Sequence, residues 1–429
     1  MVGSSRVGLR TAAAGGGLAA VLSLGSAGMA SAQTVSSIFN DVCVAHPSGS
    51  TGPCVANPGA AGAPFALSAA GVASVTPNNF NSVDFLSSTS GNTETDDALR
   101  RLQRRRAQGQ QSEQSGLTRY ADTDPRLLAA APADEVVVGP FSAFFAARGG
   151  ILDRDDTATQ RGFSGNTVGG RVGADYRVTQ ALILGAYFGY DHEESDFNAS
   201  AGNARVDNYS GIAYGSFNAT EHLYFEASGG YVYNNYSTVR NGVISLTDQS
   251  NTGQAVPAPT PFTAAGKTHG NQWLGTVGAG YELPFGAATL TPYARFNYVQ
   301  TQINAFTETS ASVVGNQVAG TITTSLTSVL GARASYALGM SWGVLIPQVR
   351  GEYIHEFDGA RQSSSRFSSD PAGATLLIND AVAHDYGKVG LSLTAVLPHG
   401  LLPYLDYEAL VGDEHFSQHI FTAGMRVEF

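Results

Sequence analysis

The nine residues at the C-terminus, FTAGMRVEF, alternate between apolar and polar side chains. The apolar positions are Phe421, Ala423, Met425, Val427 and Phe429, and the residues between them are threonine, glycine, arginine and glutamate. Because successive side chains of a β-strand point to opposite faces, this segment is predicted to be a strand with one apolar and one polar face. Tilted strands of about ten such residues cross lipid bilayers when they close into a barrel.

The same alternation recurs along the chain from about residue 136. We predict twelve strands, at 136–149, 161–178, 181–192, 204–218, 222–238, 268–283, 288–303, 321–338, 343–357, 382–397, 401–412 and 416–429. Tight turns alternate with longer connections such as 241–266 and 358–381, as in outer-membrane barrels. The predicted fold class is all-β: a twelve-stranded antiparallel transmembrane β-barrel, with a short helix and a small irregular N-terminal segment.

The polar faces of these strands distinguish a membrane barrel from a soluble sandwich. Charged residues make up 14% of the chain, against roughly 25% in soluble proteins. Charges of both signs occur among glycines on the polar faces, which suits a narrow lumen that packs ion pairs and a helix. The lumenal candidates are Glu226, Arg350, Glu352, Asp406, Glu408 and Arg426, and further charges on these faces are Arg148, Arg171, Asp175, Glu282, Arg295 and Arg333.

The first 32 residues are predicted to be a secretory signal peptide. Arg6 and Arg10 precede an apolar stretch, and Ala30-Ser31-Ala32 is a cleavage site that places the mature start at Gln33. The net charge of −11 disfavours a nucleic-acid partner.

Residues 33–92 are rich in Gly, Ala, Ser, Pro and Asn, and we interpret them as a short passenger-like or plug segment. About sixty residues of this kind bury only a marginal core, which excludes an enzyme domain. Cys43 and Cys54 are the only cysteines and are predicted to close a small disulfide loop in an oxidising compartment.

Residues 93–135 are interpreted as a linker that begins with a basic helix at 93–110. Thr93 and Asp96 resemble a capping box, and the arginines in the later turns complement the helix dipole. Two interpretations remain open at this point. The helix is either solvated on the periplasmic side or a plug among lumenal carboxylates, and in a plug Arg100 and Arg104 are the expected lumenal contacts.

Six ordered segments carry a family resemblance: SGIAYGSF, YFEASGGYVY, LTPYARFNYVQ, VLIPQVRGEYIHEF, GLLPYLDYEA and AGMRVEF. With them, residues 136–429 resemble the C-terminal translocator β-domain of autotransporters, the type V secretion family. The resemblance implies a barrel in the bacterial outer membrane, inserted by the barrel-assembly machinery, which reads the terminal strand. The assembly-signal residues are then Phe421, Met425, Val427 and Phe429.

The resemblance also implies that a passenger crosses the pore and leaves a helix inside, which residues 93–110 match. The sequence departs from the family in two ways. It lacks the long repetitive β-helix of typical passengers, so no adhesin or protease activity is carried over. About twenty-five residues separate the basic helix from the first strand, so either RLLAAAPA is the pore segment or the basic helix is not the plug.

No catalytic, phosphate-binding or zinc-binding signature occurs in the sequence, so we expect no enzyme activity, cofactor or metal. We expect an outer-membrane autotransporter that translocates or displays its own short N-terminal segment. The alternative is a structural or adhesive barrel whose extracellular loops carry the interaction. Expected partners are outer-membrane lipid, the barrel-assembly machinery and an unidentified host or cell-surface ligand.

Overall fold

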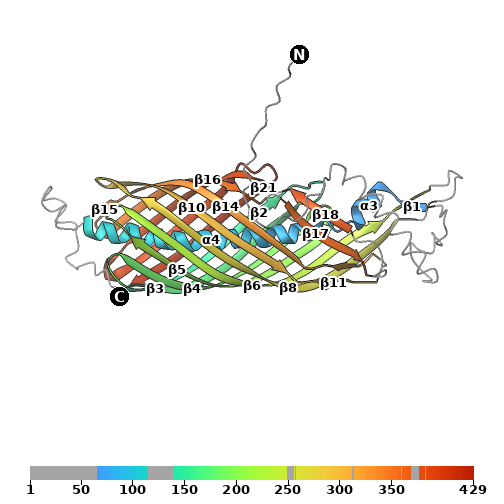
Figure 1. Ribbon diagram of the computed structural model, residues 1–429, viewed down its shortest axis with the longest axis horizontal. Coiled ribbons are helices and arrows are strands. Elements are labelled where there is room, and N and C mark those ends of the chain that lie inside the picture. The colour runs from blue at the N-terminus through green and yellow to red at the C-terminus, as the bar shows by residue number, and fades with distance from the viewer. Residues whose placement is uncertain are drawn as a thin grey trace, which may run out of the picture.

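The computed structural model describes residues 65–114, 140–248, 256, 258–311, 314–358, 360–368, 376–381 and 383–429. Twelve long antiparallel strands close into a barrel (Figure 1). In order around the barrel they are β2 Phe141–Arg154, β3 Phe163–Arg177, β4 Leu182–Phe197, β5 Gly202–Asn218, β6 Leu223–Ile244, β8 Thr260–Tyr281, β10 Ala288–Ile303, β14 Thr321–Tyr336, β16 Gly343–Glu356, β19 Asp385–Val396, β20 Leu401–Val411 and β21 Phe416–Glu428. The predicted twelve-stranded barrel is confirmed.

The barrel closes where the first long strand, β2, pairs with the last, β21. Ala143 lies opposite Val427 in this register, and the Phe429 N–H donates to the Phe141 carbonyl over 2.9 Å. Elsewhere the ring is continuous, including the pairing of β8 with β10. Closure gives every long strand two neighbours, so no strand edge of the barrel meets lipid.

The two ends of the barrel differ in their connections. At one end, which we call the short-turn end, five tight turns join β3 to β4, β5 to β6, β8 to β10, β14 to β16 and β19 to β20. The start of β2 and the end of β21 also lie at this end. Its additional elements are β9 Leu283–Phe285, β15 Leu338–Met340 and the 3-10 turn η2 Pro398–Gly400. The opposite, long-loop end carries β1 Phe65–Leu67, α3 Ala69–Val75, η1 Asn198–Ser200, β7 Leu246–Asp248, β11 Phe306–Thr307, β12 Thr309–Ser310, β13 Asn316–Val318, β17 Ala360–Phe367 and β18 Leu376–Ala381.

Apolar side chains cover the outside of the barrel. Phe188 is 75% exposed and Phe429 is 63% exposed, whereas the inward Arg426 and Glu428 are buried. Such a surface is unfavourable in water and matches the lipid-facing band of a membrane barrel. Tyrosine and tryptophan side chains such as Tyr176, Tyr281 and Trp273 are also exposed on this face, where aromatic residues anchor barrels at the membrane interfaces.

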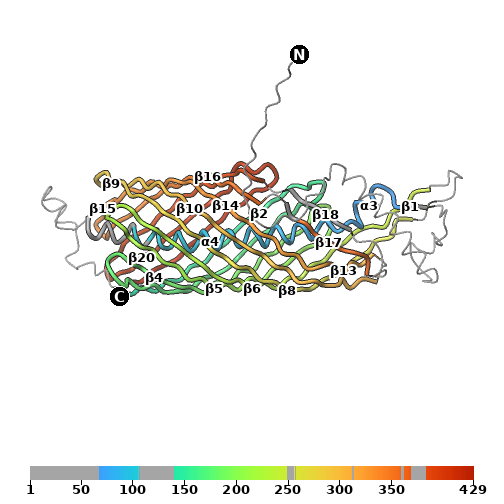
Figure 2. Tube along the Cα trace, viewed as in Figure 1, coloured from blue at the N-terminus to red at the C-terminus, as the bar shows by residue number. Residues whose placement is uncertain are grey.

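A long helix, α4 Asn79–Gln114, runs through the barrel along its axis (Figures 1 and 2). Its 36 residues make it about 54 Å long. The plug interpretation is therefore correct, and a helix lying outside on the periplasmic side is wrong. RLLAAAPA lies outside the described residues, and among those that are described α4 is the segment that fills the lumen.

The helix differs from the predicted one in its length and its start. It begins at Asn79 rather than Thr93, so residues 79–92, which we had assigned to the N-terminal segment, are lumenal helix. The capping-box interpretation is wrong, because Thr93 is mid-helix and its hydroxyl donates to the Thr89 carbonyl over 2.9 Å. The small polar side chains of 79–92 favour helix weakly by themselves, but the barrel wall gives them hydrogen-bond partners. The N-terminal region also contains β1 and α3, so it is not wholly irregular.

Among the described residues, neither helix combines the length and the apolar character needed to span a membrane.

Candidate functional site

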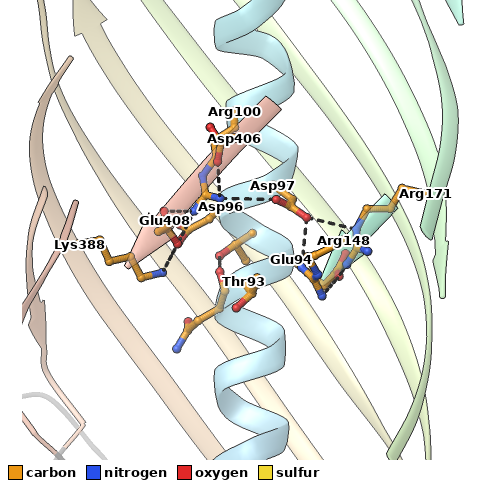
Figure 3. Close-up of polar contacts among 12 residues, drawn as sticks. Thr93, Glu94, Asp96, Asp97, Arg100, Arg148, Arg171, Lys388, Asp406 and Glu408 are labelled. Atoms are coloured by element: carbon orange, nitrogen blue, oxygen red, sulfur yellow. Dashed lines mark hydrogen bonds and ion pairs between the residues drawn. The ribbon is translucent and has the colours of Figure 1, made fainter. Parts of the chain in front are cut away.

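The candidate site is the middle of the lumen, where charged residues of α4 meet charged residues of the barrel wall (Figure 3). Three carboxylates, Glu94, Asp96 and Asp97, lie within one turn of the helix, and Arg100 follows one turn later. All four side chains are buried. Because a buried charge without a partner is very costly, the wall must supply complementary groups at this level.

On one side of the helix the wall is basic. Arg148 of β2 donates to Asp97 over 3.1 Å and to Asp191 over 2.8 Å. Arg171 of β3 donates to Asp191 over 3.0 Å and also to Glu94. This sector therefore contains two arginines and one carboxylate, and the helix adds the two carboxylates Glu94 and Asp97.

The opposite sector of the wall binds Asp96 and Arg100. The Lys388 ammonium lies 2.5 Å from Asp96, and Arg295 donates to the other Asp96 oxygen over 2.7 Å. Arg100 donates to Glu408 of β20 and lies 3.9 Å from Asp406. The helix thus presents different charges to different wall sectors, which fixes its rotation as well as its depth in the pore.

Wall residues complete this second sector by pairing with one another. Arg350 donates to both Asp406 oxygens, over 2.8 and 3.0 Å, and to Glu408 over 3.0 Å. Glu352 accepts from Arg295 over 2.9 Å, which connects it to Asp96 through that arginine. Networks in which each charge has several partners offset the desolvation cost better than isolated pairs.

Apolar contacts hold the helix beyond the charged layer and also alongside it. Toward the long-loop end, Val83, Phe85 and Leu86 pack in a cluster that includes Phe163 and Phe416 of the wall. Toward the short-turn end, Ala98, Leu99 and Leu102 pack against a second cluster, whose wall members are Phe144, Ile183, Tyr187, Ile212, Tyr214, Val232, Leu274 and Val299. The lumen is therefore more apolar than the sequence indicated, because its polar faces also carry large hydrophobic residues.

Gly91 is a position at which the helix lies close to the wall. A Cβ atom added there would lie 2.7 Å from Cγ1 of Val299 and 3.2 Å from Oε1 of Gln272. The first distance is shorter than real Cβ contacts and the second is tight, so a side chain at this position requires the wall or the helix to shift.

The last described arginines of α4 lie over aromatic rings of the wall. Arg101 stacks on Phe144 with 4.4 Å to the ring centroid, Arg104 on Tyr404 with 4.0 Å, and Arg106 on Tyr224 with 3.5 Å. Arginine stacked on an aromatic face retains a favourable interaction in a poorly solvated site. Arg104, which we expected to bind a carboxylate, therefore contacts the wall through cation–π stacking.

The structure places the other predicted lumenal residues as follows. Glu226 accepts from Gln103 of the helix over 3.4 Å, and Asp406 and Glu408 face Arg100. Arg350, Glu352 and Arg426 pair with wall residues, Arg426 with Asp175. The sequence interpretation missed the helix carboxylates as contacts, although the wall arginines that bind them were visible on the polar faces.

The predicted assembly signal lies on the outer face of β21. Phe421 and Phe429 are exposed there, and Met425 and Val427 are half-buried. Cys43 and Cys54 lie outside the described residues, so their disulfide stays a prediction.

A family model described as the autotransporter beta-domain matches residues 143–408, more than half of the chain. The chain belongs to the autotransporter β-domain family. The translocator domain of the autotransporter NalP from Neisseria meningitidis has the same fold, with a TM-score of 0.51 and 16% identity over 72% of this chain and 96% of that domain.

Two curated relatives are similar in sequence to this autotransporter barrel. Both are named outer membrane protein A, from Rickettsia conorii and Rickettsia rickettsii, and each is 24% identical over 278 residues. The match covers 62% of this chain but 13% and 12% of those proteins. The family and the fold place the barrel in the bacterial outer membrane, where short turns are periplasmic and long loops extracellular.

Proposed function

We propose that this autotransporter barrel translocates its own short N-terminal segment and displays it at the cell surface, with α4 left in the pore. The observation that carries the proposal is the direction of the helix. Asn79 lies at the long-loop end, where its side chain donates to the Ala201 carbonyl in the connection between β4 and β5. From there α4 runs toward the short-turn end of the barrel (Figure 1). The chain upstream of α4 therefore leaves the pore on the extracellular side.

The contacts along the lumen support an end state in which the helix remains in place. A charged layer, two apolar clusters and three stacked arginines hold it over most of its length. A helix held in this way anchors the upstream segment to the membrane without a membrane-spanning helix.

The test is surface labelling of the natural cysteines. Intact cells are treated with a reductant and an impermeant maleimide, and we expect Cys43 and Cys54 to be labelled without permeabilisation. The control is Gly339→Cys in a Cys43→Ser, Cys54→Ser background, because Gly339 lies on the short-turn end in open space. That residue should be labelled only after permeabilisation, and the same result for Cys43 and Cys54 would contradict display.

The alternative function, an adhesive barrel whose loops bind a ligand, has one supporting observation. The connections at the long-loop end form a four-stranded sheet of β11, β13, β17 and β18. This sheet is separate from the barrel wall, and joining neighbouring strands of the barrel does not require it. Deleting residues 33–64 separates the two functions. Binding of cells to a host surface would survive the deletion if the loops carry the interaction, and would be lost if the displayed segment carries it.

A further inference from the structure

The segment just upstream of α4 is bound to the extracellular end of the barrel by its backbone. β1 pairs with β7, with Leu67 opposite Leu246, and the Ser68 N–H donates to the Ser245 carbonyl over 2.9 Å. Farther along, the Val243 N–H donates to the Ser74 hydroxyl over 2.7 Å. The segment therefore adds a strand and the helix α3 to the projecting β6–β7 part of the rim.

Gly71 allows α3 to lie directly on this rim. A Cβ atom there would lie 2.3 Å from the Ser245 carbonyl oxygen, a backbone atom that cannot rotate away. The close approach therefore depends on glycine. Substitution by alanine would raise the helix propensity of α3 and at the same time push it off the rim.

Arg240 of β6 connects the segment to the rest of the rim. Its guanidinium donates to both Glu308 oxygens, over 3.1 and 2.6 Å, and also to the carbonyls of Val75 over 3.3 Å and Val314 over 2.8 Å. Arg240 and Glu308 are buried, and Val75 is the last residue of α3. One arginine thus joins α3, the strand β6 and the connection between β10 and β14.

The start of α4 is bound to a different sector of the rim. The Asn79 amide donates to the Ala201 carbonyl over 3.2 Å, and the Asn81 amide to the Thr159 carbonyl over 2.9 Å. The Ser82 hydroxyl donates to the Arg161 carbonyl over 2.6 Å. These acceptors belong to the β2–β3 and β4–β5 connections, so the segment is held from more than one side of the mouth.

We infer that residues 65–82 act as a latch, an intramolecular docking segment that stays bound to the extracellular rim and closes the mouth of the pore over α4. The presence of the chain upstream of this latch at the cell surface rests on the proposed function, whereas the docking itself is a property of the purified chain. The docking surface is the projecting β6–β7 region together with the Arg240–Glu308 pair.

The test is limited proteolysis of the purified full chain in detergent with proteinase K, with cleavage sites mapped by mass spectrometry. We expect residues 65–82 to be protected in the wild type and to be cut at least about tenfold faster in Gly71→Ala and in Arg240→Ala, because cleavage follows the population of the opened segment. Matched controls are Gly275→Ala, where nothing lies near an added Cβ, and Arg205→Ala, an exposed arginine paired with Glu194. Both controls should be cut at the wild-type rate.

Single-channel recording of the same proteins gives a second readout, and we expect more frequent open events in the two latch variants than in the controls. Only variants whose gel mobility still changes on heating, as a folded barrel requires, are compared. Gly71→Ala removes no charge, so it tests the latch even if Arg240→Ala fails to fold. Wild-type cleavage rates and conductance in Gly71→Ala would overturn the inference. Cysteines that are labelled only after permeabilisation would instead overturn display and leave the latch intact.

Discussion

Arg171 of β3 and Glu94 of α4 form a buried ion pair in the middle of the lumen, although they lie 77 positions apart in the chain. The pair exists only when the barrel is closed and the helix is threaded at one depth and one rotation. It therefore reports directly on the end state of the chain.

Replacing Glu94 with alanine should destabilise the barrel by about 3 kcal/mol, because Arg148 and Arg171 lose a common buried acceptor. The measurement is the midpoint of thermal unfolding of the purified chain in detergent, read from heat-modifiable gel mobility. The matched control is Glu194→Ala, which removes an exposed partner of Arg205 and should cost at most about 1 kcal/mol. Equal losses in the two variants would show that the charged layer is no stronger than a surface pair.

Gly91→Ala should lower stability by about 1–3 kcal/mol through overpacking against Val299, even though alanine favours helix more than glycine does. Truncating the neighbour relieves the clash, so the Gly91→Ala, Val299→Ala double variant should lose less than the sum of the two single losses. Gly351→Ala is the control, because an added Cβ at Gly351 meets no other atom. Strictly additive losses would mean that the helix does not approach Val299.

Phe429→Ala should reduce the amount of folded barrel recovered in the outer membrane, as the proposed assembly signal requires. Phe429 is 63% exposed, and its ring centroid lies 5.9 Å from that of Phe141. Phe145→Ala is the matched control, since Phe145 lies on the same outer face and is 57% exposed. A similar loss in both variants would indicate that outward aromatic area, rather than the terminal position, decides assembly.

The barrel was predictable from the sequence because the outer and inner faces of its wall have different surroundings. Lipid outside and charges inside impose a period of two on every strand, and the predicted strand at 288–303 coincides with β10. The strands β6 and β8 are longer than predicted, because they project beyond the apolar band, where lipid no longer imposes the alternation.

The helix and its contacts were only partly predictable, because they depend on closure. Residues such as Ser87, Ser90 and Gly91 indicate weak helix propensity, and only the wall compensates for it. Asp96 was interpreted as part of a capping box at the start of the helix. It lies mid-helix instead, as does Asp97, and the two carboxylates bind wall cations such as Arg148, Arg295 and Lys388. Contacts between α4 and the barrel wall join residues far apart in the sequence, so no local sequence pattern predicts them.

Paired cysteines report on the depth and rotation of α4 in the pore. Ser90 accepts from Asn208 of β5 over 3.2 Å, and Asn92 donates to Ser325 of β14 over 3.4 Å. In a Cys43→Ser, Cys54→Ser background, we expect a short thiol crosslinker to join cysteines at 90 and 208 and at 92 and 325, as mapped by mass spectrometry. The exchanged pairs, 90 with 325 and 92 with 208, should stay unlinked. Equal crosslinking of all four pairs, or of none, would contradict a helix held at this depth and rotation in the pore.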